Sequence, residues 1–400
     1  MVTEIAPGPV PSSQLTVGYA RPQQQTRATP VVRGGENHPM RKHKGLKSAA
    51  LALAAFALIA SACGSDDNAA SDEATDDTAA EEVTEETAAP LPGAGTLACM
   101  VTDTGGVDDK GFNQISYEGM KKAESELGVT IDLLESSSDA DYAPNLQSFA
   151  DKGCNITVTV GFLLGDATKA AAEANAGLSY AIVDYAYDPP IANARGLVFA
   201  TDQPSFMAGY LSAAMSTTGI VGTYGGINIP PVTIFMEGFR KGVEYYNAQK
   251  GKSVKLLGWD GKDGTFAGNF ESLDDGKNIA KSQADEGADI IFPVAGPVGL
   301  GSAQFALESG GKVKIIGVDV DMSKSNPDAA AVYVASVLKN IDAAVFAAIK
   351  DVVEGSAVTD NYVGTLANGG VGVAFTAVPA ELQAEVEAIG KGIADGTIKL

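Results

Sequence analysis

From Gly95 to the end of the chain, short apolar runs alternate with helical patterns, and this alternation limits the possible folds more than any other feature. Strands that alternate with helices form a parallel sheet with helices on both faces. The series starts again after about Thr201, so the sequence predicts two α/β lobes. The predicted strands are 96–101, 129–135, 156–160, 179–183 and 197–200 in the first lobe, and 220–224, 254–259, 290–293 and 314–318 in the second.

The lobe boundaries follow from this pattern. We expect a first lobe over 94–203, a second over 204–325, and a segment over 326–400 that begins with a crossover helix and returns to the lobes. Two such lobes joined by several crossings make a hinged clamp, and ligand sites favour interfaces of this kind. The predicted helices are 112–127, 143–152, 166–176, 231–248, 276–286, 298–309 and 331–353.

The segment 40–62 has the architecture of an export signal. A basic cluster precedes an apolar run over 49–59, which is too short to span a membrane, and three small residues follow it. The small residues end at Cys63 and resemble a bacterial lipobox. This implies cleavage before Cys63, a lipid on its sulfur, and anchoring at the extracytoplasmic face of the cell membrane. An ordinary signal cleaved near Ala62 is the alternative, because Ala60 stands where a lipobox usually has Leu.

The regions on either side of this signal have compositions that do not support a packed core. Residues 1–39 are rich in Pro, Gln and Arg, and we expect them to be disordered or misassigned, with Met40 as the true initiator. Residues 63–93 contain ten Asp and Glu and no Lys or Arg. A segment that is so charged and so poor in apolar side chains is expected to be a disordered acidic tether.

Charge and histidine content exclude several classes of function. The formal net charge of −22 leaves no basic face for nucleic acid. Both histidines, His38 and His43, precede Cys63, so the processed chain would have none. Catalysis by Ser-His-Asp or Cys-His groups and metal sites with His ligands are therefore excluded. We expect a binding protein without enzymatic activity, metal or cofactor.

The stretch 101–114, Val-Thr-Asp-Thr-Gly-Gly-Val-Asp-Asp-Lys-Gly-Phe-Asn-Gln, connects the first predicted strand to the first predicted helix. Asp103 therefore stands at the carboxyl end of a strand, where ligands bind in open α/β sheets. The stretch has neither of the glycine patterns that cradle phosphates. With its single aromatic residue, Phe112, it suits a polar, partly aromatic small molecule.

The two remaining cysteines both lie in the first predicted lobe. Cys99 lies in the first predicted strand and Cys154 just before the third, and these strands are neighbours in a sheet of order 2-1-3. Because an exported protein meets an oxidising compartment, a disulfide between them is possible. Two buried free thiols are the alternative.

Several short motifs recur in a characteristic order behind the lipobox. They are 102–114, 160–162, 182–184, 207–211, 295–296, 317–321 and 336–340. In this order and spacing they resemble the basic membrane protein family, the purine-nucleoside-binding lipoproteins that feed ABC importers. The resemblance covers nearly all of the chain from about Thr96. It implies a two-lobed clamp of the periplasmic-binding-protein type I class, with a purine nucleoside as ligand and an importer permease as partner.

The resemblance assigns roles in the first lobe and to the aromatic rings. Phe112 and Phe270 would stack on the two faces of the base, with Phe266 as the fallback for the second ring. Asp103 and Asn113 would line the wall of the first lobe. Packing in the core is the alternative for the two phenylalanines. Capping of the following turn, a common role of Asp, is the alternative for Asp103.

The remaining implied roles fall at the ends of later strands. Asp184 would meet the edge of the base, and Gly296 would let the backbone approach the ligand. Asp319, rather than Asp321, and Lys339 would hydrogen-bond the ribose hydroxyls. A turn-capping role for Asp184 and a solvated position on the predicted helix for Lys339 stay open.

One departure from the family pattern leaves the ligand less certain. Gly111 stands where the family has Ser, which removes a hydroxyl although Gly is a tolerable N-cap. A receptor of the same architecture for a sugar, an amino acid or another small polar ligand also stays open. So do a surface sensor or adhesin, and a nucleoside hydrolase with a metal bound by the Asp cluster in 103–109.

Overall fold

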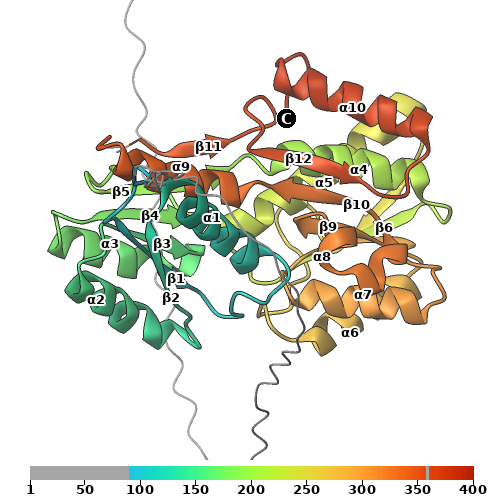
Figure 1. Cartoon of the computed structure of the whole chain (residues 1–400). Coiled ribbons are helices and arrows are strands. Elements are labelled where there is room, and N and C mark those ends of the chain that lie inside the picture. The colour runs from blue at the N-terminus through green and yellow to red at the C-terminus, as the bar shows by residue number, and fades with distance from the viewer. Residues whose placement is uncertain (1–89, 357–359) are drawn as a thin grey trace, which may run out of the picture. The chain divides into compact units, whose positions relative to one another are not determined.

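The computed structural model describes residues 90–356 and 360–400, and these form two α/β lobes, each built on one six-stranded sheet (Figure 1). The export signal, Cys63, residues 1–39 and nearly all of the acidic tether lie outside the described residues. No helix in the described part of the chain is long and apolar enough to cross a membrane.

The sheet of the first lobe has the order β11-β5-β4-β3-β1-β2, with every neighbouring pair parallel. Helices α1 and α9 pack on one face, and α2 and α3 pack on the other. The strands are β1 (Leu97–Thr102), β2 (Thr130–Leu134), β3 (Ile156–Val160), β4 (Ser179–Val183), β5 (Ala194–Phe199) and β11 (Tyr362–Gly364). The helices are α1 (Phe112–Leu127), α2 (Tyr142–Lys152), α3 (Gly165–Ala174) and α9 (Ile341–Val353).

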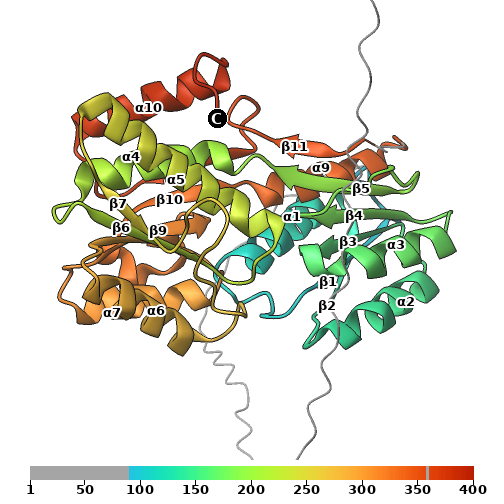
Figure 2. The same ribbon diagram turned by 180° about the vertical axis from the view of Figure 1, so that it is seen from behind.

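The sheet of the second lobe repeats this plan with the order β12-β10-β9-β8-β6-β7, in which only β12 runs antiparallel to its neighbour. Helices α4, α5 and α10 cover one face, where they lie side by side (Figure 2), and α6 and α7 cover the other. The strands are β6 (Ile220–Gly225), β7 (Lys255–Leu257), β8 (Ile290–Val294), β9 (Lys314–Asp319), β10 (Tyr333–Lys339) and β12 (Val371–Phe375). The helices are α4 (Asp202–Met215), α5 (Pro230–Lys250), α6 (Leu273–Asp285), α7 (Val298–Glu308), the short α8 (Met322–Ser325) and α10 (Ala380–Ala394).

Both sheets contain the doubly wound order 2-1-3-4-5, in which ligands bind at the carboxyl ends of the strands. The described chain crosses between the lobes at three places: from β5 to α4, from β10 to α9, and from β11 to β12. The three crossings lie close together, because Asn340 N–H donates to the carbonyl of Gly370 and Ala200 N–H donates to that of Gly364. The lobes are therefore joined along one side.

The prediction of one helix over 331–353 is wrong. Residues 333–339 form strand β10 of the second lobe, and helix α9 starts only at Ile341 and packs in the first lobe. Six of the seven residues of β10 are buried, so the strand shows no alternation of apolar and polar residues. A short apolar run of this kind cannot be told from a buried helix by periodicity alone. Lys339 thus ends a strand instead of lying within a helix.

Helix α4 was not among the predicted helices. Ten of its fourteen residues are buried, because it lies between α5 and α10 and also contacts β10 and β12. A helix that is covered on nearly all sides has no polar stripe, so its sequence lacks the amphipathic signal on which the other helices were predicted.

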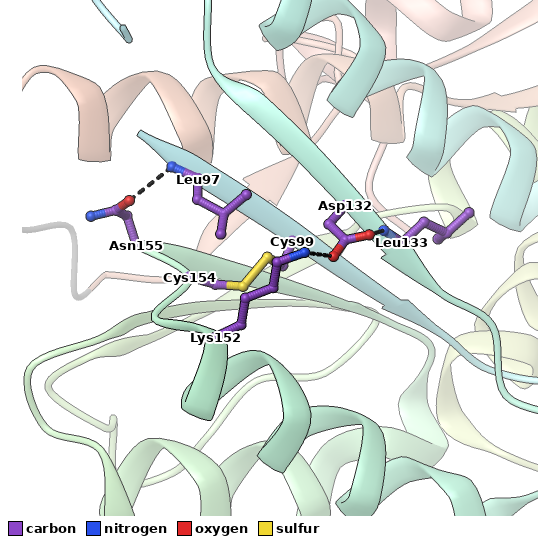
Figure 3. Close-up of a disulfide and its surroundings, with 7 residues drawn as sticks. All are labelled: Leu97, Cys99, Asp132, Leu133, Lys152, Cys154 and Asn155. Atoms are coloured by element: carbon purple, nitrogen blue, oxygen red, sulfur yellow. Dashed lines mark hydrogen bonds and ion pairs between the residues drawn. A yellow bond between two sulfur atoms is a disulfide. The ribbon is translucent and has the colours of Figure 1, made fainter. Parts of the chain in front are cut away.

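Cys99 and Cys154 form a disulfide in the first lobe (Figure 3). Their Cα atoms are 6.0 Å apart, and both side chains are fully buried. Asn155 accepts a hydrogen bond from the N–H of Leu97 at 2.8 Å, and an ion pair joins Lys152 to Asp132 of β2. The disulfide thus links β1 to the turn that leads into β3, at the end of the sheet opposite the carboxyl ends of the strands.

Asp109 organises the start of helix α1, which carries Phe112 and Asn113. Its carboxylate accepts hydrogen bonds from the backbone N–H groups of Gly111, Asn113 and Gln114 at 2.8–3.0 Å. The first N–H groups of a helix have no partner within the helix, so a buried carboxylate that accepts several of them stabilises its first turn. The capping role in this loop therefore belongs to Asp109 and not to Asp103.

We predict that Asp109→Ala lowers the free energy of unfolding by about 1–3 kcal/mol, because it leaves buried N–H groups without an acceptor. Asp108→Ala is the matched control, since Asp108 is exposed and next in sequence. Urea unfolding followed by circular dichroism measures both. Equal stability of the two variants would contradict the capping role.

Candidate ligand-binding site

A cavity lies between the two lobes, at the carboxyl ends of their strands. Every ligand-binding candidate from the sequence lines it. The first lobe contributes Asp103, Phe112, Asn113 and Asp184, and the second contributes Phe270, Gly296, Asp319 and Lys339.

The three carboxylates among these residues stand at or directly after the end of a strand. Asp103 follows β1, Asp184 follows β4, and Asp319 ends β9. Asp184 and Asp319 have φ angles of 68° and 67°, a left-handed conformation that Asp tolerates better than most residues. Because parallel strands end at the same edge of a sheet, residues far apart in the sequence meet here.

Gly161, at the end of β3, makes room for the carboxyl group of Asp103. A Cβ atom at position 161 would lie 2.4 Å from Oδ2 of Asp103, and the φ of Gly161 is 118°. Neither is compatible with a larger residue. The N–H of Asp103 also donates to the carbonyl of Val160, so the backbone and the neighbouring glycine together determine where this carboxyl lies.

Lys339 joins the two lobes inside the cavity. Its ammonium group is 2.5 Å from Oδ2 of Asp184, and the two side chains are only 2% and 10% exposed. The same nitrogen lies 4.7 Å from the ring centroid of Phe112, a distance at which a cation is attracted to the face of an aromatic ring. The position of the Lys339 ammonium therefore depends on both Asp184 and Phe112.

Phe270 and not Phe266 lines the cavity. A Cβ atom at Gly226 would lie 2.2 Å from the ring of Phe270, so this ring rests directly on the backbone after β6. Phe266 packs edge-on against Trp259, with ring centroids 6.3 Å apart, outside the cavity lining. The choice of Phe270 over its fallback agrees with where the two rings lie.

Further lining residues were not assigned a part in ligand binding from the sequence. The apolar ones come from both lobes, and most of them have the sequence pattern of core residues, so nothing marked them as cavity residues. They are Phe162, Leu163, Ile229, Pro231, Val232, Phe235, Val294, Val318 and Pro297, and a polar one is Asp109. Together they give the cavity largely apolar walls around a few carboxylates.

Burial perturbs two of these carboxyl groups strongly. Desolvation raises the pKa of Asp103 to about 8, with further increases from the negative charges of Asp109 and Asp184 and an opposing effect of the Asn113 amide. Desolvation also raises the pKa of Asp319 to about 6, although the positive charge of Lys339 opposes this shift. Perturbed carboxyl groups that share a cleft are typical of functional sites.

In the described part of the chain, no group of three or more His, Cys, Asp or Glu side chains is arranged to hold a metal ion. The acidic residues of 103–109 are therefore not gathered around a common point. Asp109 caps α1, Asp103 faces the cavity, and Asp108 is exposed.

A family model described as "ABC transporter substrate-binding protein PnrA-like" matches residues 96–399. The chain belongs to this family. The family description is that of a binding protein and not of an enzyme, in agreement with the resemblance found in the sequence.

Named relatives agree with this assignment. Basic membrane protein A of Borreliella afzelii is 34% identical over 226 residues, 56% of this chain and 66% of that protein, so the match spans slightly less than two thirds of its length. The ABC transporter nucleoside-binding protein BmpA of Lactococcus lactis subsp. cremoris is 31% identical over 328 residues, 75% of this chain and 88% of that protein.

The solved structure of an ABC transporter solute-binding protein from Aeropyrum pernix has a TM-score of 0.68 to this chain. It covers 76% of this chain and 92% of its own chain at 24% identity. At this identity the likeness concerns the fold, and it confirms the predicted two-lobed periplasmic-binding-protein class.

We predict that Lys339→Met lowers the free energy of unfolding by about 3–5 kcal/mol, because the Asp184 carboxylate is then buried without a partner. The double variant Asp184→Asn/Lys339→Met should recover much of this loss, since neither charge remains. Urea unfolding of the three proteins measures the difference. A double variant as unstable as the single one would show that packing, and not the unpaired charge, causes the loss.

Proposed function

We propose that this protein is the extracytoplasmic receptor of an ABC importer and that its two lobes close around a purine nucleoside. One observation carries the proposal: a cavity between the lobes combines the rings of Phe112 and Phe270 with the polar groups of Asp103, Asp184 and Lys339. The name of the nucleoside-binding relative from Lactococcus lactis supports the choice of ligand.

The aromatic and apolar part of the cavity suits a nucleobase. A purine has two flat faces that water solvates poorly and a polar edge. Aromatic rings such as Phe112 and Phe270 can stack on these faces and bury them. The apolar walls of Val232, Val318 and Phe235 exclude water around them, which strengthens every hydrogen bond made at the edge of the base.

The charged part of the cavity suits a ribose. Neighbouring hydroxyl groups donate well to a carboxylate, and hydrogen bonds to ionised groups are the stronger ones. Asp319 is 7% exposed and lies in the same cavity as Lys339, whose ammonium donates. We assign these two residues to the ribose, and Asp103, Asn113 and Asp184 to the edge of the base.

The rest of the proposal concerns the membrane. We propose that Cys63 carries the lipid anchor, that the acidic tether separates the lobes from the membrane surface, and that an importer permease receives the nucleoside. The family description as an ABC transporter substrate-binding protein supports a permease partner.

Isothermal titration calorimetry with inosine, guanosine, adenosine and D-glucose tests the ligand class. We expect nucleosides to bind and to raise the melting temperature, because a ligand of the native state stabilises it. Binding of the hexose and of no nucleoside would identify a sugar receptor. Release of free base during the titration would identify a hydrolase.

The variant Phe112→Leu tests the stacking. It keeps an apolar side chain but loses the flat ring, and we predict an affinity about 3–10-fold lower for nucleosides, from a stacking term of roughly 0.5–1.5 kcal/mol. Phe266→Leu is the matched control outside the cavity. A similar affinity of Phe112→Leu and the unchanged protein would remove this ring from the site.

A contact between the lobes away from their crossings predicts an effect on the rate of ligand release. The Ser325 hydroxyl of the second lobe donates to the Lys110 carbonyl of the first, and Lys110 has a left-handed φ of 60°. We predict that Ser325→Ala releases the ligand about 3–10-fold faster, because a closed-state hydrogen bond of ~0.5–1.5 kcal/mol is lost. Stopped-flow fluorescence measures the release.

The control for this experiment is Ser323→Ala in the same short helix. The Ser323 hydroxyl bonds only within its own lobe, to Asp321. Equal release rates for the two variants would show that the Ser325 contact does not hold the lobes together.

A further inference from the structure

Asn113 has a buried acceptor that no group of the described protein satisfies. The residue is 2% exposed, its Nδ2 donates to the carbonyl of Thr104 at 3.3 Å, and its Oδ1 has no hydrogen-bond partner. Because a carbonyl can only accept, the amide nitrogen must face Thr104, and Oδ1 lies on the other side. Since Asn113 lines the cavity, this orphaned oxygen calls for a donor on the ligand.

Asp103, on the same wall, is the carboxyl group of the cavity with the least compensation. Asp109 accepts three backbone N–H groups and Asp184 is paired with Lys339. No Lys or Arg in the described part of the chain lies within ion-pair distance of Asp103, and the only side chain that offers it a hydrogen bond is the neutral amide of Asn113.

The other groups that face Asp103 also disfavour its ionisation. The negative charges of Asp109 and Asp184 raise the pKa of Asp103. Tyr142 of helix α2 lies near enough that the charge of Asp103 raises the pKa of its hydroxyl. Burial among these groups raises the pKa of Asp103 to about 8, so its carboxyl carries a proton at neutral pH. The proton makes this carboxyl a hydrogen-bond donor.

We propose that Asp103 binds the ligand as a neutral carboxylic acid that donates a hydrogen bond, while Oδ1 of Asn113 accepts one beside it. This inference rests on the proposed nucleoside function and specifies which edge of a base is recognised. The pair complements an edge with one acceptor next to one N–H donor. Adenine has this edge at N7 and N6, and hypoxanthine has it at O6 and N1.

The pH dependence of adenosine affinity tests the proposal, because the base of adenosine does not titrate between pH 6 and 10. We expect a constant Kd up to about pH 7.5 and then an increase approaching tenfold per pH unit, as Asp103 loses its proton. Calorimetry of the full chain at each pH gives Kd, and circular dichroism shows that the fold persists.

Two substitutions separate a donor from an acceptor at this position. Asp103→Ala should weaken adenosine binding at every pH, since it removes the donor. Asp103→Asn keeps an N–H donor that does not titrate, so it should bind more tightly than Asp103→Ala and show no fall above pH 7.5. Purine riboside, which has no donor at the 6-position, should bind the unchanged protein at least tenfold more weakly than adenosine.

The failures of the two proposals look different. If neither adenosine nor inosine binds at any pH, the nucleoside function itself is wrong. If nucleosides bind but the affinity stays flat to pH 9.5, or if Asp103→Asn is as weak as Asp103→Ala, then Asp103 accepts as a carboxylate and the inference is overturned.

Discussion

The buried ion pair between Lys339 and Asp184 is the interaction on which the rest of the site depends. Lys339 ends a strand of the second lobe and Asp184 follows a strand of the first, so one contact spans the boundary between the sheets. The cavity also contains Asp103, Asp109 and Asp319, and Lys339 is the one cation among its lining residues in the described chain. Without this ammonium group, Asp184 and Asp319 would lose the positive charge that counteracts the rise of their pKa on desolvation.

The remaining carboxylates are accommodated in different ways. Asp109 is satisfied by the backbone at the start of α1, so it supports the helix that carries Phe112 and Asn113. The positive charge of Lys339 acts on Asp319 and partly offsets the rise of its pKa on burial. Asp103 has neither arrangement and retains its proton instead. The same apolar walls that would bury a base therefore raise the pKa of the carboxyl groups that would bind it.

The comparison of sequence and structure shows where local patterns are sufficient. The strand-loop-helix order around 101–114 placed Asp103, Phe112 and Asn113 at a strand end and a helix start, and all three line the cavity. Asp184 and Asp319 were named from the family resemblance, and the structure places them at strand ends in the same way. Helix α4 and strand β10 were missed or misassigned because burial on all sides removes the periodic signal.

The sequence by itself determined the class of fold, the family and the set of residues at the strand ends, because these depend on local periodicity and on short motifs. Only the tertiary structure decided that Lys339 pairs with Asp184 across 155 positions, and that Asp109 and not Asp103 caps a helix. It also decided that Asn113 is left with an orphaned acceptor beside an uncompensated carboxyl. These properties arise from desolvation and from contacts between distant segments, and neither is encoded in the neighbourhood of a single residue.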